Sequence, residues 1–130
     1  MDILLVDTSV WINFFKAKET ASSLFLKNNL SNFIIGTCPI ILQEVLQGTF
    51  SEKDFRIVNS YFDTLFKFRG DNYEYAYDAA KLYRALRKKG ITIRKPNDCL
   101  IATYAIKHNV KLLHDDKDFD FIAANSNLVV

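Results

Sequence analysis

Four acidic positions stand in or beside apolar stretches of this sequence. Asp7 follows the aliphatic run Ile3–Val6, Glu44 and Asp98 lie on the apolar faces of helical-looking segments, and several aspartates crowd together between residues 115 and 120. Carboxylates gathered in one crevice oppose each other's ionisation unless cations neutralise them. Without a histidine or cysteine cluster, such oxygen ligands suit Mg²⁺ or Mn²⁺. These ions assist the hydrolysis of phosphodiesters by activating water.

Each acid also has an ordinary structural explanation. Asp7 could cap a helix that begins near Val10, and Asp98 could complement the dipole of a first helical turn. Glu44 could pair with a lysine or arginine from elsewhere in the fold, and the aspartates of 115–120 could form a solvated turn. The joint arrangement, with two acids at strand ends and two on inward helix faces, favours the metal site.

The elements that must position these acids alternate along the chain. Expected strands cover residues 3–6, 32–37, 110–114 and 127–130, and expected helices cover 9–16, 21–30, 39–48, 51–66, 73–90 and 96–109, with the acidic segment 115–120 as a loop. Short aliphatic strands separated by helices predict an α/β fold, in which a mainly parallel central sheet is flanked by helices. Ligands of such folds collect at the carboxyl ends of the strands, where Asp7 would lie.

Composition favours one domain over residues 1–130. The chain is 49% hydrophobic, has no repeat or linker-like stretch, and carries a net charge of only +2. Cys38 and Cys99 form no C-x-x-C pair, which argues against a zinc site and favours a reducing, cytoplasmic location. There is no signal-peptide pattern and no apolar run near the ~18 residues of a membrane span, so we expect no membrane association.

The segments "LLVDTSVWI", "LQEVLQG", "PNDCLIATYA" and "LLHDDKDFD" resemble the four motifs of PIN-domain nucleases, and specifically of VapC-type toxins of toxin–antitoxin pairs. The resemblance spans nearly the whole chain. It implies a PIN-like three-layer sandwich that acts as a Mg²⁺- or Mn²⁺-dependent endoribonuclease on RNA. It also implies a homodimer and a cognate VapB-type antitoxin whose C-terminal segment occupies the active-site groove.

The resemblance further implies roles for individual residues. The catalytic and metal-binding acids would be, in chain order, Asp7, Glu44, Asp98 and Asp116. Thr8 matches a hydroxyl position that supports the site, whereas His114 replaces the hydroxyl residue usual at the fourth motif. Asp116 or Asp118 could be the fourth acid; we assign Asp116 and expect Asp118 to support it.

A basic run precedes the third motif. It comprises Arg84, Arg87, Lys88, Lys89, Arg94 and Lys95, with no acid among them. These cations could position a phosphate backbone without reading its bases, or those of 87–89 could simply complement the end of a helix. Tyr73, Tyr75 and Tyr77 cannot all point inward from one helix, so some could cover a dimer interface.

Other classes of function remain in competition with the ribonuclease. A phosphoacceptor receiver domain needs an acidic pair after its first strand and a lysine after its last, and neither is present. A catalytically silent PIN-like module that binds RNA or protein would keep the same acids. A DNA-directed nuclease of the same broad fold is disfavoured because no DNA-binding arch is inserted. Metal-dependent cleavage separates these classes, but the sequence does not identify the RNA, the number of ions or the antitoxin.

Overall fold

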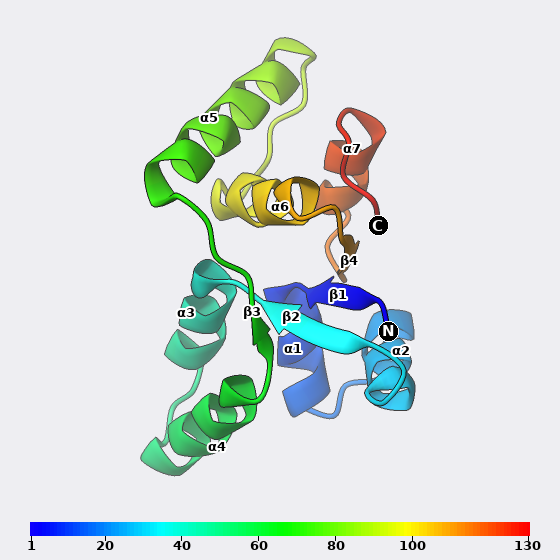
Figure 1. The fold of residues 1–130 in the computed structure, drawn as a ribbon, viewed down its shortest axis with the longest axis vertical. Helices are drawn as coiled ribbons and strands as arrows, with labels where there is room; N and C mark the ends of the chain where they lie inside the picture. The colour runs from blue at the N-terminus through cyan, green and yellow to red at the C-terminus, as the bar shows by residue number, and fades with distance from the viewer.

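A four-stranded sheet runs through the middle of the molecule in the computed structural model, which describes residues 1–130 (Figure 1). The strands are β1 (Ile3–Val6), β2 (Ile34–Thr37), β3 (Phe66–Lys67) and β4 (Lys111–Leu113). The helices are α1 (Thr8–Phe15), α2 (Ala21–Asn29), α3 (Pro39–Gln47), α4 (Glu52–Asp63), α5 (Asn72–Lys88), α6 (Asn97–Lys107) and α7 (Asp118–Ala124).

All neighbouring strands are parallel, in the order β3-β2-β1-β4. Leu4, Leu5 and Val6 of β1 are buried, as expected for a central strand that is covered on both faces. Because every strand points the same way, the carboxyl ends meet along one edge. Asp7 follows β1 at that edge, and His114 follows β4.

Helices cover both faces of the sheet. Figure 1 shows α1 to α4 on one side and α5 to α7 on the other, with α6 between α5 and the sheet. The predicted α/β fold, a three-layer sandwich with a parallel central sheet, is therefore confirmed. Helix α6 is the most enclosed of these helices, and Ile101, Ala102 and Ala105 on it have no exposed surface. No helix has both the length and the apolar content needed to cross a membrane.

Short-range signals account for where several helices begin. The side chains of Thr20, Ser51 and Asp71 accept hydrogen bonds from backbone N–H groups in the first turns of α2, α4 and α5. Pro39 opens α3, where its missing N–H would have had no partner within the helix. These residues therefore fix where the four helices begin.

Three expected elements differ from the structure. The predicted helix over 51–66 ends at Asp63, because Phe66–Lys67 pairs with β2 as strand β3. The acidic segment is not entirely a loop, since α7 begins at Asp118 and gains from acids in its first turn. The predicted strand over 127–130 is wrong: Val129 accepts one backbone hydrogen bond from Leu112, and no ladder follows.

Candidate active site

Asp7 caps helix α1 from the end of β1. Its Oδ2 accepts hydrogen bonds from the backbone N–H of Ser9 at 3.0 Å and from the Ser9 hydroxyl at 2.6 Å. The capping explanation is therefore correct for this oxygen. The other oxygen, Oδ1, is buried and has no hydrogen-bond partner. Burial raises the pKa of Asp7; the Ser9 hydrogen bonds oppose this rise, and the charge of Glu44 adds to it.

Asp98 lies in the first turn of α6 and is only 4% exposed. Its Oδ2, like Oδ1 of Asp7, is buried without a hydrogen-bond partner. Burial raises the pKa of Asp98 to about 7, and the charges of Asp7 and Asp116 act in the same direction. The helix dipole explains an acid in this turn, but it leaves the buried oxygen unsatisfied, which is unusual and costly in a folded protein.

Glu44 approaches the carboxyl end of β1 from α3. It is half-buried, and its Oε1 accepts a hydrogen bond of 2.7 Å from the hydroxyl of Thr8. Glu44 forms no ion pair, so the alternative of a lysine or arginine partner is not realised. The contact fixes the direction of the Glu44 carboxylate beside Asp7.

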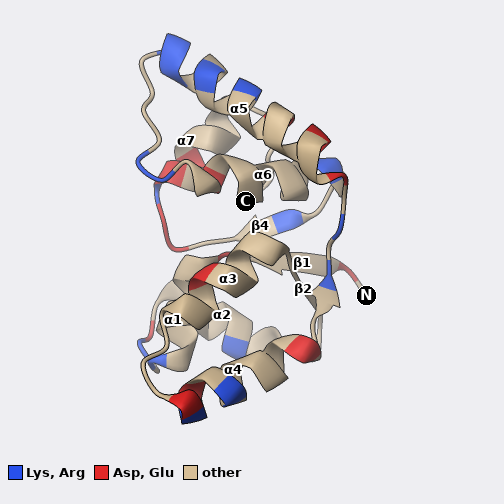
Figure 2. Cartoon of the chain, turned by 90° about the vertical axis from the view of Figure 1, so that its left-hand side faces the viewer, with Lys and Arg blue, Asp and Glu red and all other residues tan.

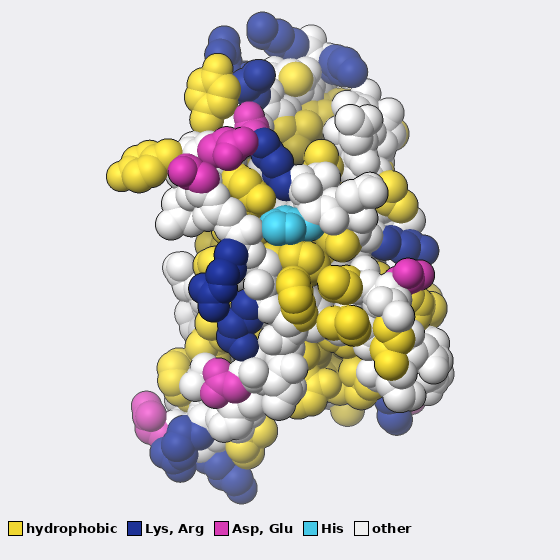
Figure 3. All heavy atoms as spheres, viewed as in Figure 1, with side chains coloured by type: hydrophobic (Ala, Val, Ile, Leu, Met, Phe, Trp, Pro, Cys, Tyr) yellow, Lys and Arg dark blue, Asp and Glu magenta, His cyan; other side chains and the backbone are white.

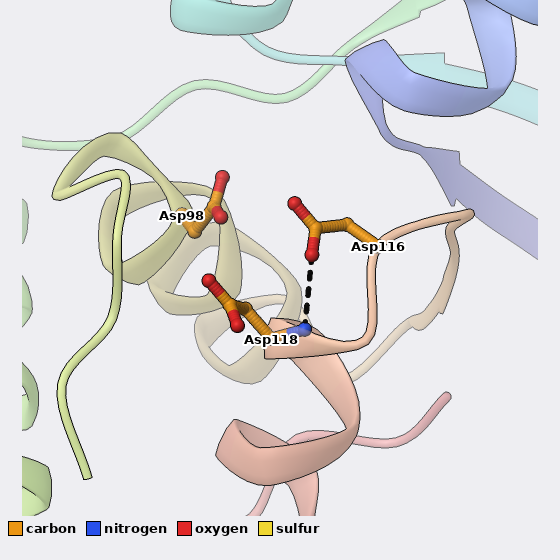
Figure 4. Close-up of side chains that lie close together, drawn as sticks. All are labelled: Asp98, Asp116 and Asp118. Carbon is orange, nitrogen blue, oxygen red and sulfur yellow. Dashed lines mark hydrogen bonds between the residues drawn. The ribbon is translucent and has the colours of Figure 1, made fainter.

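Asp116, in the connection between β4 and α7, and Asp118, the first residue of α7, lie close to Asp98. One carboxylate oxygen from each of these three residues lies within 4.8 Å of the others, and Figure 4 shows the side chains converging. Oδ1 of Asp116 accepts the backbone N–H of Asp118 at 3.0 Å. Asp7 and Glu44 lie outside this cluster, although their charges still raise the pKa of Asp98.

Two cations of the basic run contact this cluster. Arg94 pairs with Asp118 through Nε at 3.2 Å and with Asp116 through Nη2 at 3.3 Å, and Lys95 Nζ lies 3.6 Å from Asp116 Oδ2. Burial alone would raise the pKa of Asp116, but the backbone N–H of Asp118 and the charges of Lys95 and Arg94 lower it. Asp98 and Asp116 thus have opposite pKa shifts within one site.

The acidic residues surround the carboxyl ends of the strands. Figure 2 views this edge of the sheet and shows acidic segments on α3, near the start of α6 and in the β4–α7 connection. Oxygen donors predominate, and two of them, Oδ1 of Asp7 and Oδ2 of Asp98, are buried without a partner. This set fits a hard divalent cation, which prefers carboxylate oxygens and retains part of its water shell.

The cysteines are unsuited to nucleophilic chemistry. Cys38 and Cys99 are free and buried. Burial raises the pKa of Cys38 to about 12 and that of Cys99 to about 11, so both thiols keep their protons at neutral pH.

Sequence reasoning missed the hydroxyl and amide groups that tie the β4–α7 connection to the first motif. Ser9 Oγ accepts the backbone N–H of Asp115 at 3.0 Å while it donates to Asp7. Asn13 and Thr20 donate to Oδ2 of Asp115 at 2.8 and 2.7 Å. These contacts hold Asp115 away from the cluster. The position of Ser9, two residues after Asp7, is the only local signal for them.

Residues 4–125 match the PIN domain family. The VapC ribonuclease Mb1587 of Mycobacterium bovis is 34% identical over 128 residues, covering 97% of this chain and 96% of that protein. The ribonuclease VapC11 of Mycobacterium tuberculosis is likewise 34% identical over 128 residues, with the same coverage of both chains. The resemblance noted in the four motifs is therefore confirmed along nearly the full length.

Solved structures agree in fold. VapBC2 from Rickettsia felis, bound to a DNA fragment from its promoter, superposes with a TM-score of 0.73 at 21% identity, over 98% of this chain and 96% of the matched chain. VapBC-1 from nontypeable Haemophilus influenzae also has a TM-score of 0.73 at 21% identity, over 98% and 95% of the two chains. By its sequence match and its fold, this chain belongs to the PIN domain family and is a relative of the VapC ribonucleases.

Proposed function

We propose that this protein is a metal-dependent endoribonuclease and the toxin of a toxin–antitoxin pair. The observation that carries the proposal is the pair of buried carboxylate oxygens without a hydrogen-bond partner, on Asp7 and Asp98. A capping or dipole role leaves both oxygens unsatisfied, whereas a divalent cation would satisfy them. The naming of the matched mycobacterial relatives as VapC ribonucleases supports RNA as the substrate.

Asp7, Glu44, Asp98 and Asp116 would hold the ion, which we expect to be Mg²⁺ or Mn²⁺. When bound, such an ion polarises water and a phosphate oxygen for hydrolysis. Hydrogen bonds within the protein orient two of these carboxylates: Ser9 donates to one oxygen of Asp7, and Thr8 donates to Glu44. The pKa of Asp98 is raised to about 7, so this carboxyl is partly protonated near neutral pH and would have to be ionised to serve as a ligand.

The fourth acid remains Asp116 in this proposal, with Asp118 in support. Oδ2 of Asp118 accepts from both the backbone N–H and the Nε of Arg94, so that oxygen is already engaged. Asp116 keeps Oδ2 with only Lys95 at 3.6 Å. Asp118 then serves to hold the arginine and, through its backbone N–H, to orient Asp116.

The proposal includes two protein partners, a VapB-type antitoxin and a second copy of this chain. The solved neighbours named above are VapBC assemblies, which supports a VapB-type antitoxin as the partner of this chain. Tyr73 and Tyr77 are 90% and 66% exposed on α5 while Tyr75 is buried, so α5 has aromatic surface for the expected homodimer. The two free cysteines support a cytoplasmic location.

The decisive experiment is cleavage of total cellular RNA by wild-type protein and by Asp98→Asn, each with Mg²⁺, with Mn²⁺ and with EDTA. Asp2→Asn serves as the matched control, because Asp2 is exposed and its side chain forms no hydrogen bond or ion pair. We expect discrete fragments from the wild type and the control that require metal and vanish in Asp98→Asn. Absence of cleavage in every condition would indicate a silent binding module, and cleavage of DNA alone in a parallel assay would indicate a DNA-directed nuclease.

A further inference from the structure

Arg94 lies in the connection between α5 and α6, and it is held by the carboxylates of Asp116, in the β4–α7 connection, and of Asp118, at the start of α7. Its backbone N–H and Nε donate to Oδ2 of Asp118 at 3.3 and 3.2 Å, and its Nη2 donates to Oδ1 of Asp116 at 3.3 Å. The two acids have side chains only 5% and 9% exposed, whereas the Arg94 side chain is 63% exposed. One edge of the guanidinium is therefore fixed against the acids while the rest faces solvent.

The open edge has unused donor capacity. A guanidinium carries five N–H donors in a planar fork. The side-chain contacts of Arg94 use two of them, so three have no partner in the protein. One edge of the guanidinium is held by carboxylates and the other edge is exposed, so the exposed edge can bind a second anion. A phosphate fits this edge because it can accept two parallel hydrogen bonds from the planar fork.

Lys95 is the only other cation of the basic run that reaches these acids, through a single contact of 3.6 Å between its Nζ and Oδ2 of Asp116, and an ammonium lacks the planar fork of a guanidinium. Arg84, Lys88 and Lys89 are exposed and form no hydrogen bond or ion pair through their side chains. Figure 3 shows Lys and Arg side chains gathered at the top of the molecule, over the C-terminal half of α5. Arg94 differs from them because its contacts fix it beside the candidate metal ligands.

We propose that Arg94 is a phosphate-binding residue that receives a backbone phosphate of the RNA on its open edge, beside the acidic site. This inference rests on the proposed ribonuclease function and names a residue that the four acidic motifs do not include. Asp118 is then the residue that orients Arg94. The phosphate bound there places the neighbouring phosphodiester over the carboxylates without any contact to a base.

Binding of a fluorescently labelled single-stranded RNA oligonucleotide, measured by anisotropy in EDTA over a series of salt concentrations, tests the inference without cleavage. Arg94→Gln keeps a side-chain N–H for Asp118 and removes the charge, whereas Arg94→Lys keeps the charge and removes the planar fork. Arg56→Ala is the control, because Arg56 is an exposed, unpaired arginine on α4. We expect Arg94→Gln to raise the Kd about tenfold and to reduce the slope of log K against log salt by about 0.7. Arg94→Lys should keep the slope and recover part of the affinity, and Arg56→Ala should change neither.

RNA binding by Arg94→Gln separates the inference from a simple neutralising role, and calorimetric titration with Mn²⁺ measures the neutralising role itself. If Arg94 only balanced the charges of Asp116 and Asp118, Arg94→Gln would bind Mn²⁺ more tightly and bind RNA as the wild type does. That result would overturn the inference while leaving the nuclease proposal intact. A wild-type protein that neither binds nor cleaves RNA would instead overturn the nuclease proposal and the inference with it.

Discussion

Replacing Asp98 with asparagine should stabilise the metal-free protein at neutral and alkaline pH. The folded protein raises the pKa of this carboxyl from 3.8 to about 7. A rise of about three units corresponds to about 4 kcal/mol of unfavourable interaction with the ionised form. Structural relaxation and water penetration reduce such penalties in folded proteins, so we expect about 2 kcal/mol. The substitution keeps the shape of the side chain and replaces one carboxyl oxygen with an uncharged NH2 group.

The size of the effect depends on pH. A carboxyl whose pKa is raised on folding contributes stability at low pH, and that contribution is lost as the pH rises through the folded pKa. The wild type should therefore lose stability relative to Asp98→Asn between about pH 4 and about pH 8. The difference in unfolding free energy should be near zero at the acid end and about 2 kcal/mol in favour of the variant at the alkaline end.

Urea unfolding in EDTA at several pH values measures this difference, with Asp2→Asn as a control expected to stay within about 0.5 kcal/mol of the wild type. Added Mg²⁺ should reverse the ranking, since a ligand at about one hundred times its Kd stabilises the folded state by about 2.7 kcal/mol and the variant loses a ligand. The reasoning would be refuted if Asp98→Asn were less stable than the wild type at alkaline pH, or if the difference in unfolding free energy did not change with pH.

Three further substitutions test the packing and the site. Gly36→Ala would place a methyl group against the ring of Phe68, and a loss of about 1–3 kcal/mol should appear as a lower urea midpoint. Trp11→Ala should cost about 3–5 kcal/mol in the same assay, because the indole is fully buried among aromatic rings. Thr8→Val removes the hydrogen bond to Glu44; its unfolding free energy should fall by about 1 kcal/mol while RNA cleavage falls about tenfold, and unchanged cleavage would show that Thr8 does not support the site.

Much of the fold was predictable because its signals are local. The aliphatic runs of β1, β2 and β4, and apolar spacing in the first six helices, describe what each segment buries. Strand β3 could not be found in this way: Phe66 and Lys67 are exposed, only two residues are involved, and the strand exists because β2 offers it a partner. Residues 127–130 show the opposite error. Their apolar side chains suggested a strand, but only Val129 accepts a sheet-like hydrogen bond.

In the candidate site, too, the features with local signals were predictable and those that depend on tertiary contacts were not. Burial of Asp7 and Asp98 was foreseeable from their apolar surroundings. The acidic segment was expected to be a loop, and its crowded aspartates were interpreted as metal ligands because like charges repel unless cations neutralise them. Relief of this repulsion comes from Arg94, which lies 24 residues before Asp118 and reaches it only in the folded chain. Which cation of a basic run meets which acid is decided by tertiary structure, and the run itself did not single out Arg94.

The backbone hydrogen bond from Leu112 to Val129 has a consequence for how this protein can associate. β4 is an edge strand, and its outward N–H at Leu112 is already occupied by the segment that carries the buried Leu128. The opposite edge, β3, is only two residues long. Neither edge offers the row of free backbone groups on which a foreign strand could be added. A partner of this protein must therefore be recognised by side chains and helix surfaces, and trimming residues 126–130 should expose a β edge prone to aggregation.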